Sequence, residues 1–252
     1  MKFYVSMTTI PSRIFYIYKT IDSILLQTHL PEKIYVNIPK YYKRFNKTII
    51  SCYPNLTSEM YELEKIKLKY KSIVEINIID DDYGPGTKLL GLLTINNKYN
   101  NDDFVLLIDD DVIYKKDAFD IIYKNINILD NKNAYTFHSY DWNGLIIGQG
   151  SDIFVLPINC LDDIINFYQI IKPYQFIFLH DDIWISYYLM KKSIKINKLK
   201  YVDESIYDPH CFIDELNKLI DNNERELITN KSIDILKKLD IENFFLFMNK
   251  QL

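Results

Sequence analysis

Three groups of aspartates in the sequence could carry chemistry, and each one follows an apolar run. They occupy residues 80–82, 109–111 and 181–182. Carboxylate oxygens are the ligands that Mg²⁺ and Mn²⁺ prefer, and these ions keep positions open for water and for substrate phosphates. Several carboxylates at one edge of a sheet repel each other unless a cation lies between them. The pattern therefore favours a divalent cation that binds a diphosphate.

The strongest of the three groups is residues 109–111, because it directly follows the continuously apolar residues 104–108. Such a run is typical of a central strand that is buried on both faces. Alternate aspartates past a strand end can point to one side, one toward a metal ion and one toward a ribose hydroxyl. The metal would act as a Lewis acid on the departing nucleoside diphosphate. A turn role explains residues 80–82 better, because Gly-Pro-Gly follows them.

The elements that would position these groups alternate between strand and helix in the first half of the chain. Strands are predicted at residues 3–7, 33–38, 74–79 and 104–108, and helices at residues 14–27, 59–69 and 88–96. Ser12 is the expected N-cap of the first helix. This alternation predicts a mostly parallel, doubly wound α/β sheet, in which ligands bind beyond the carboxyl ends of the strands.

The second half of the chain has a less regular pattern. Strands are predicted at residues 134–138, 151–156 and 195–199, and helices at residues 161–171 and 183–190. From Phe212 onward the pattern is helical with alternating charges, which is typical of a helix that packs on a folded domain. We therefore expect one α/β domain over residues 1–211 and a helical extension over residues 212–252 that packs on it.

Composition and charge limit the kind of partner. Apolar residues make up 48% and charged residues 25% of the chain, as in an ordinary folded protein. The net charge of −4 argues against a nucleic-acid partner, which requires a basic face. Three cysteines without metal-type spacing favour a reducing compartment. No apolar stretch is long enough for a membrane span or a signal peptide, so a cytoplasmic location is expected.

Four motifs resemble those of the GT-A glycosyltransferases, and they occur in the same order. LLIDDDV (residues 106–112) is similar to the D-x-D motif, and VSMTTIPSR (residues 5–13) to the first strand and nucleotide-binding loop. TIDSILLQT (residues 20–28) resembles the helix that follows, and YGPGTKL (residues 83–89) the Gly-Pro-x-x-Lys segment of a sugar-nucleotide site. Four ordered matches are more specific than one acidic triad. The resemblance, from about residue 2 to residue 209, implies a GT-A, Rossmann-like fold.

The resemblance also implies a metal site. Asp109 would face the ribose and the metal, and Asp111 would bind the metal and the diphosphate oxygens. Asp110 could share either task, because a triple aspartate leaves the register open. His210 matches the histidine that completes the metal coordination in many members, although a structural role is equally open. Mn²⁺ or Mg²⁺ is the expected ion.

Other segments would bind the nucleotide-sugar donor. By the resemblance, Thr8, Pro11 and Arg13 line the base and ribose pocket. Lys88 would approach the diphosphate or the donor sugar, with a solvated helix position as the alternative. The segment GQGS (residues 148–151) fits the loop beneath the donor sugar and the acceptor, or an ordinary glycine turn.

The acidic pair after residue 180 is the candidate catalytic group. Asp182 is the first choice for the base that accepts the proton of the acceptor hydroxyl, and Asp181 is the second. The alternative is an N-cap for a helix that begins at Ile183. The family's Glu-Asp motif is Asp-Asp here, which leaves the stereochemistry open, and we favour inversion over retention.

These observations predict a metal-dependent glycosyltransferase of the hexosyl- or N-acetylhexosaminyltransferase class. The expected donor is a UDP-sugar, and the acceptor is a hydroxyl of a glycan, a protein or a small molecule. One alternative is a phosphatase of the haloacid-dehalogenase type, with Asp109 as nucleophile and Asp111 and Val112 completing its motif. That motif should begin its domain, whereas strands and helices precede it here. A second alternative is a catalytically inactive, sugar-binding relic.

Overall fold

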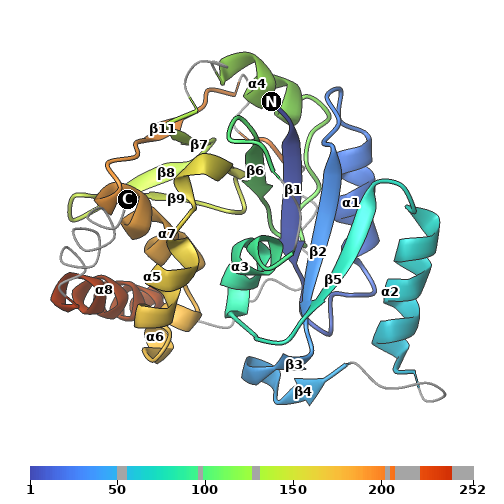
Figure 1. Cartoon of the computed structure of the whole chain (residues 1–252), viewed down its shortest axis with the longest axis horizontal. Coiled ribbons are helices and arrows are strands. Elements are labelled where there is room, and N and C mark those ends of the chain that lie inside the picture. The colour runs from blue at the N-terminus through green and yellow to red at the C-terminus, as the bar shows by residue number, and fades with distance from the viewer. Residues whose placement is uncertain (50–55, 96–98, 127–130, 202–204, 208–221, 240–252) are drawn as a thin grey trace.

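The computed structural model describes residues 1–49, 56–95, 99–126, 131–201, 205–207 and 222–239, and these contain a seven-stranded central sheet. Its strands are β1 (Phe3–Thr8), β2 (Lys33–Pro39), β5 (Val74–Ile79), β6 (Phe104–Leu107), β7 (Ala134–Thr136), β10 (Phe154–Pro157) and β11 (Ile196–Lys198). Their order across the sheet is β11-β7-β10-β6-β1-β2-β5 (Figure 1). Neighbouring strands are parallel, except that β10 runs antiparallel to β6 and β7. The predicted mostly parallel α/β fold is confirmed.

Helices cover both faces of the sheet. One face carries α1 (Ile17–Leu25), α2 (Ser58–Lys69) and α4 (Ala118–Asn125), and the other carries α3 (Thr87–Leu93), α5 (Ile164–Ile171) and α7 (Asp181–Lys191). Side chains alternate between the two cores along each strand, as the pleat requires. In β6, Leu106 belongs to the first core and Leu107 to the second. Burial on both faces therefore explains the unbroken apolar run that the sequence shows before Asp109.

Two short hairpins lie beside the sheet, and the sequence analysis predicts neither of them. The first consists of β3 (Tyr41–Tyr42), the 3-10 helix η1 (Lys43–Phe45) and β4 (Lys47–Thr48). The second pairs β8 (Ser139–Trp142) with β9 (Leu145–Gly148). Its loop residues Asn143 and Gly144 have φ angles of 53° and 85°. Two left-handed residues match the twist of the flanking strands, which explains the Asn-Gly sequence there.

Several helix starts differ from the sequence prediction, and α5 begins at Ile164, three residues after its predicted start. Ser12 is not the N-cap of α1, because residues 11–16 form turns and the helix begins at Ile17 after Tyr16. In these turns the carbonyl of Arg13 accepts hydrogen bonds from the N–H groups of Tyr16 and Ile17. The helix predicted to start at Ile183 begins two residues earlier, as α7.

Three further short helices complete the described fold. They are η2 (Gly84–Gly86), which leads into α3, η3 (Ile158–Cys160), which leads toward α5, and α6 (Gln175–Phe178), which precedes α7. At Gly84 the φ angle is 60°, and a Cβ there would lie 2.3 Å from the carbonyl oxygen of Phe178. This close contact between η2 and α6 brings the start of α3 next to the start of α7.

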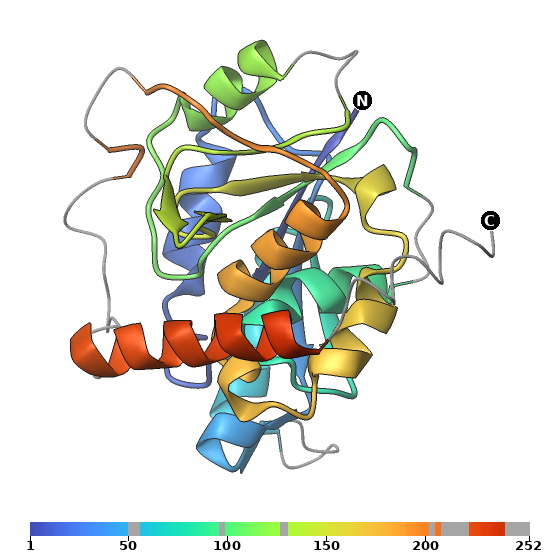
Figure 2. The same cartoon turned by 90° about the vertical axis from the view of Figure 1, so that its left-hand side faces the viewer.

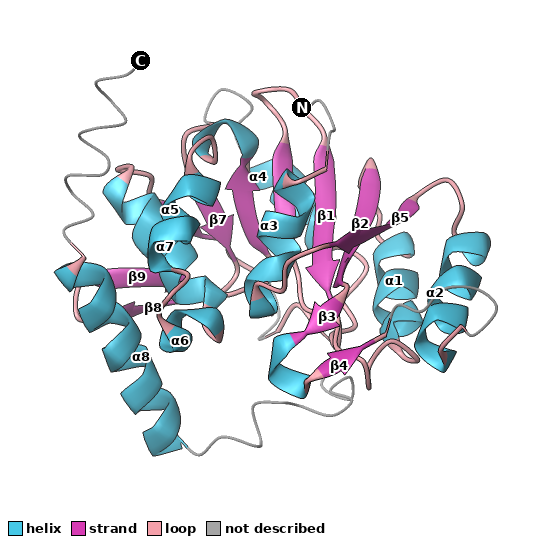
Figure 3. Ribbon diagram, turned by 60° about the horizontal axis from the view of Figure 1, so that its bottom comes forward, coloured by secondary structure: helices cyan, strands magenta, loops and turns pink. Residues whose placement is uncertain are grey.

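The C-terminal helix α8 (Asn222–Lys238) packs against α6 and α7 (Figures 2 and 3). Its buried residues Ile233 and Leu236 belong to the second core, and Trp142 Nε1 donates to Asn230 Oδ1 at 2.9 Å. The rest of the predicted extension, residues 212–221 and 240–252, lies outside the described residues. Among the described helices, none combines the length and the apolar character needed to cross a membrane.

Candidate active site

A cleft of about 310 Å³ lies at the carboxyl ends of the central strands. Its wall brings together residues from β1, η1, α3, the segment after β6, the loop after β9, and the helices α7 and α8. The charged side chains that line it are Arg13, Arg44, Asp82, Lys88, Asp109, Asp110, Asp111, Asp181, Asp182 and Arg225. This is the position at which open α/β sheets bind ligands.

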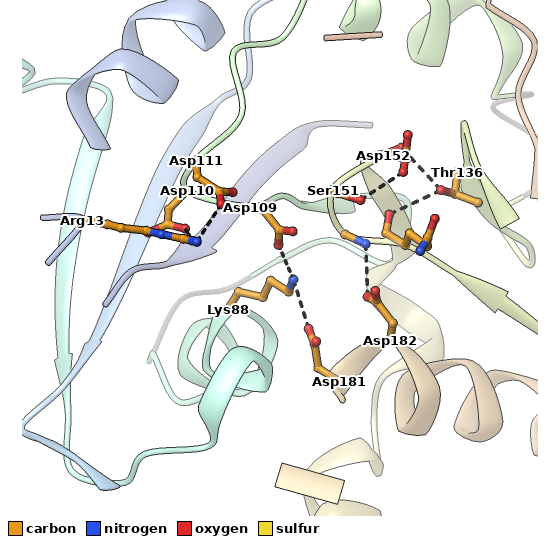
Figure 4. Close-up of polar contacts among 12 residues, drawn as sticks. Arg13, Lys88, Asp109, Asp110, Asp111, Thr136, Ser151, Asp152, Asp181 and Asp182 are labelled. Atoms are coloured by element: carbon orange, nitrogen blue, oxygen red, sulfur yellow. Dashed lines mark hydrogen bonds and ion pairs between the residues drawn. The ribbon is translucent and has the colours of Figure 1, made fainter. Parts of the chain in front are cut away.

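Asp110, Asp111 and Asp109 all line the cleft, and Asp110 is the most enclosed, with 7% of its side chain exposed against 12% for Asp111 and 37% for Asp109. Figure 4 shows the three side chains with Arg13 and Lys88. One of its carboxylate oxygens accepts from Thr9 Oγ1, and the other pairs with Arg13 Nη1 at 2.8 Å. Its backbone carbonyl accepts from Thr20 Oγ1 at 2.8 Å. Burial raises the pKa of Asp110, and the cation of Arg13 and the hydroxyl of Thr9 oppose this effect. With both carboxylate oxygens engaged, Asp110 anchors the loop.

Asp111 and Asp109 are each held by one cation of the protein. Arg13 Nη2 lies 2.8 Å from Asp111 Oδ2, and Lys88 Nζ lies 2.8 Å from Asp109 Oδ1. Burial raises the pKa of Asp111 to about 7, helped by the charges of Asp109 and Asp110 and opposed by Arg13. Asp109 is more open, with 37% of its side chain exposed. The two cations reduce the repulsion that the sequence analysis expects between the clustered acids.

Lys88 is a buried lysine that joins two of the acidic groups. Besides Asp109, its Nζ pairs with Asp181 Oδ2 at 3.1 Å, and its side chain is only 4% exposed. Burial lowers the pKa of Lys88, but Asp109, Asp181 and Asp182 raise it by more, so the net direction is well upward. Lys88 is therefore a charged residue of the cleft wall, and a solvated helix position is ruled out by its burial.

The first turn of α3 is fixed from below by a buried polar network. The carbonyl of Lys88 accepts from Ser6 Oγ in β1 and from Asn37 Nδ2 in β2 at 3.3 Å. Asn37 Nδ2 also donates to Ser6 Oγ at 2.9 Å, and Asn77 Nδ2 in β5 donates to Asn37 Oδ1 at 3.0 Å. Three neighbouring strands thus determine where the ammonium group of Lys88 lies.

The two acids of α7 lie in the first turn of the helix, where its dipole favours negative charge. The N-cap is His180, which makes no side-chain capping bond, and the helix begins at Asp181, so neither aspartate is the N-cap that the alternative interpretation requires. Asp182 Oδ1 accepts from the N–H of Gly150 at 3.1 Å. Burial raises the pKa of Asp182 well above its usual value; Asp181 and Asp109 add to this, and Lys88 and the N–H of Gly150 oppose it.

Gly150 closes the wall between the acid groups. A Cβ at this position would lie 2.5 Å from Lys88 Nζ and 3.3 Å from Asp109 Oδ1. Because its N–H also donates to Asp182, Gly150 lies next to Lys88 of α3, Asp109 after β6 and Asp182 of α7. The glycine is needed for this close approach, so the segment 148–151 is more than an ordinary turn.

The remaining predicted residues have different positions. Thr8 lines the cleft, and its Oγ1 donates to the carbonyl of Asn37 at 2.8 Å. Pro11 is buried and does not line the cleft. His210 lies outside the described residues. Asp82 lines the cleft, but its carboxylate accepts the backbone N–H groups of Lys43 and Gly84 at 2.7 and 2.8 Å, which is turn chemistry.

The sequence analysis missed two parts of the cleft lining. The first hairpin contributes Tyr42, Arg44 and Phe45, and α8 contributes Arg225 and Thr229. The grouping of aromatic and basic residues in YYKRF (residues 41–45) is a signal that could have identified the hairpin as a ligand-binding edge. No comparable signal exists for α8, because its pattern is that of any amphipathic surface helix.

The carboxylates of the cleft fit a hard divalent cation in part. Asp109 and Asp111 supply the oxygen donors that Mg²⁺ and Mn²⁺ prefer. Within the described ranges, no three His, Cys, Asp or Glu side chains converge so as to hold an ion by themselves. One or two carboxylates, completed by substrate phosphates and water, is a common arrangement for Mg²⁺. The donor set therefore fits a metal that is bound together with a diphosphate.

Comparison with known proteins gives structural similarity only. No protein-family model and no curated protein matches the sequence. Three of the similar structures are the mannosyltransferase PcManGT from Pyrobaculum calidifontis in complex with GDP-Man and Mn²⁺, the cytidylyltransferase IspD from Francisella tularensis, and TarS from S. aureus in complex with UDP. The neighbours thus include nucleotide-sugar glycosyltransferases.

The similarity to these structures is distant. PcManGT is 12% identical to this chain, with a TM-score of 0.44. The match covers 65% of this chain and 46% of the PcManGT chain. IspD is 12% identical, with a TM-score of 0.44; the match covers 82% of this chain and 94% of IspD. TarS is 16% identical, with a TM-score of 0.40; the match covers 65% of this chain and 48% of TarS. The chain thus spans about half the length of the two transferases.

Proposed function

We propose that the protein is a glycosyltransferase that transfers a sugar from a nucleoside diphosphate sugar to a hydroxyl acceptor. The observation that carries this proposal is the convergence of Asp109, Asp111, Lys88 and Asp182 in one cleft. They come from three separate segments and meet where an α/β sheet binds ligands. Carboxylates for a metal–diphosphate group, beside a separate carboxylate that can accept a proton, are what glycosyl transfer requires.

Asp109 and Asp111 would hold Mn²⁺ or Mg²⁺ in this proposal. When bound, the ion would supply Lewis-acid stabilisation of the negative charge on the leaving diphosphate. Asp110 keeps the loop in place through Thr9 and Arg13, so its neighbours stay directed at the cleft. If His210 binds the metal as the resemblance implies, it completes the ligands that the protein supplies to the ion.

Asp182 would be the proton acceptor for the attacking hydroxyl. Burial raises the pKa of Asp182, so its carboxylate, when ionised, is a stronger base than that of an exposed aspartate. Asp181 is paired with Lys88, and this pairing favours Asp182 over Asp181 for the role. As the oxygen of the acceptor forms its bond to the anomeric carbon, the bond to the diphosphate breaks, and inversion is the stereochemical result.

The donor we propose is a UDP-sugar, and the transferred group is a hexosyl or N-acetylhexosaminyl residue. Thr8 and Arg13 lie on the β1 side of the cleft, where the resemblance places the base and the ribose. Lys88 would act from the buried wall by keeping Asp109 and Asp181 in place. The acceptor would approach from the side of Asp182 and α8.

Two substitutions test the assignment. Asp111→Asn should lower metal-stimulated hydrolysis of the donor about a hundredfold or more, because the ion loses a charged ligand. Asp182→Asn should leave donor binding within about twofold of wild type and lower transfer about a hundredfold. Donor binding is measured by thermal shift or calorimetry with Mn²⁺, and turnover by release of UDP.

The alternatives predict different products in the same assays. A haloacid-dehalogenase-type phosphatase would release inorganic phosphate from a simple phosphomonoester, and Asp109→Asn would abolish that release. An inactive sugar-binding relic would bind sugar without releasing UDP from any donor. Phosphate release without UDP release would contradict the transferase proposal.

A further inference from the structure

Arg13 occupies an unusual position for a residue of a nucleotide-binding loop. Its side chain is 9% exposed, and its two terminal nitrogens each bind a different carboxylate, Asp110 Oδ1 and Asp111 Oδ2, both at 2.8 Å (Figure 4). The planar fork of an arginine suits such a bridge, which a lysine cannot make. The guanidinium therefore lies against the carboxylate that the proposed function assigns to the metal.

The two halves of this bridge differ in what surrounds them. Asp110 is fixed by Thr9 and by Thr20 in addition to Arg13. Asp111 lies at the cleft, and the hydrogen bonds described for its carboxylate come from Arg13 alone among side chains. Both pairs therefore lie at the cleft wall, and Asp111 has fewer protein contacts than Asp110 to hold it against a ligand.

The backbone of Arg13 is fixed, so only the side-chain end has freedom to move. Its N–H donates to the carbonyl of Ile10 at 2.9 Å, and its carbonyl accepts from Tyr16 and Ile17. A second, small hollow of about 10 Å³ lies next to Arg13 and is lined by Tyr16, Lys19, Thr20, Asp110, Asp111 and Ile113.

We propose that Arg13 is the resident counter-ion of Asp111 and competes with the divalent cation for it. Loading of the metal exchanges the Arg13–Asp111 ion pair for a metal–carboxylate bond, and the Arg13–Asp110 pair persists. A guanidinium and a divalent cation at one partly buried carboxylate repel each other, so the guanidinium weakens the binding of the metal there. This inference rests on the proposed function for the place of the metal, and it assigns Arg13 a task apart from the base and ribose pocket.

The competition sets the metal affinity of the protein before any nucleotide binds. Because the metal must replace a charge-assisted pair, the affinity of the wild type for Mn²⁺ is lower than two carboxylates would otherwise give. Removing the guanidinium should raise the affinity about tenfold, which is the equivalent of one hydrogen-bonded ion pair. A residue that merely shapes a base pocket would leave the affinity unchanged.

The test measures Mn²⁺ binding to the full chain without nucleotide, by the electron paramagnetic resonance signal of the free ion. Arg13→Gln removes the guanidinium, but it leaves Asp110 buried without its cation and can prevent folding. The double variant Arg13→Gln/Asp110→Asn removes the buried pair together, and the two introduced amides can bind each other. Arg13→Gln should bind Mn²⁺ about tenfold more tightly than wild type if it folds, and the double variant, which also loses the charge of Asp110, should bind Mn²⁺ more tightly than Asp110→Asn alone.

A matched control separates exchange at Asp111 from a general change in charge. Lys19 lies on α1, lines the hollow behind Arg13 and does not line the main cleft. Lys19→Gln removes the same unit of positive charge as Arg13→Gln and should alter Mn²⁺ affinity less than about twofold, because Lys19 forms no ion pair with Asp111 in the described structure. An equal gain for Lys19→Gln and Arg13→Gln would overturn the proposal.

The remaining outcomes distinguish this inference from the proposed function. If folded Arg13→Gln binds Mn²⁺ as wild type does, or the double variant binds it as Asp110→Asn does, the competition is wrong while the metal site stands. If Asp111→Asn binds Mn²⁺ as wild type does, the metal is elsewhere, and both proposals about Asp111 are wrong. Release of UDP from a donor is measured separately, so the activity is judged on its own.

Discussion

At the scale of single residues, the acidic triad divides into two functions. Asp110 binds Thr9 and Arg13 with its two carboxylate oxygens, whereas Asp109 and Asp111 each pair with one cation. The sequence leaves the register of a triple aspartate open, because three identical residues give no pattern. What resolves it is the pair Arg13–Asp110, which joins residues 97 positions apart. Such a contact depends on the folded sheet and cannot be derived from local spacing.

Gly150 provides a test of whether the position of Lys88 matters. In Gly150→Ala the new methyl group would lie 2.5 Å from Lys88 Nζ, so the ammonium must move away from Asp109. We expect turnover of the donor to fall about tenfold to a hundredfold, because small displacements of positioned groups are costly. The free energy of unfolding should change by about 1 kcal/mol or less, since the displaced atom ends a flexible side chain. Steady-state release of UDP and urea unfolding measure the two effects.

Gly144→Ala is the matched control for this substitution. A Cβ at Gly144 meets no atom within 4 Å, but its φ angle of 85° is unfavourable for alanine. The change should cost about 1 kcal/mol of stability and leave turnover at the wild-type level. If both variants lose only stability, or if Gly150→Ala keeps full turnover, the position of Lys88 is unimportant for the reaction.

At the scale of elements, the apolar pattern of the sequence predicts the strands of the central sheet well. The strand predicted at residues 74–79 has the same bounds as β5, and the strands predicted before residues 39 and 109 agree with β2 and β6 within one residue. The helix predicted from residue 14 begins only at Ile17, as α1, because residues 11–16 form turns in which Arg13 binds Asp110. The starts of helices near the cleft depend on contacts with distant segments, which the sequence pattern does not contain.

The network beneath α3 leads to a prediction for Asn37. This side chain is fully buried in β2 and donates to Ser6 Oγ and to the carbonyl of Lys88. Asn37→Ala leaves buried polar groups without partners and should lower the free energy of unfolding by about 2 kcal/mol. Turnover of the donor should also fall, because Lys88 is no longer fixed from below. Urea unfolding and UDP release at a temperature where the variant is folded give the two values.

Asn77→Ala serves as the control for Asn37. Asn77 belongs to the same network but is half-buried, and it reaches Lys88 only through Asn37. We expect a loss of less than about 1 kcal/mol and turnover close to wild type. Equal losses of turnover in the two variants would mean that the network acts on stability alone.

At the scale of the whole molecule, the cleft depends on segments from most of the described chain. Residues near position 10 and residues near position 225 line the same space, although the sequence places them at opposite ends. The fold class follows from alternating strands and helices, so it could be predicted. The contribution of α8 could not, because a charged amphipathic helix gives no indication of which surface it will cover.

The packing of α8 gives the last prediction, which concerns whether the helix and the sheet unfold as one unit. Leu236 is fully buried in the second core, whereas Leu227 on the same helix is 51% exposed. Leu236→Ala should lower the free energy of unfolding by about 2–4 kcal/mol in a single transition, because it leaves a cavity. Leu227→Ala should cost less than about 0.5 kcal/mol, since it removes little buried surface. If Leu236→Ala instead left the main transition unchanged, α8 would unfold independently of the sheet. Arg225 and Thr229 would then not be held at the cleft wall for the proposed binding of donor and acceptor.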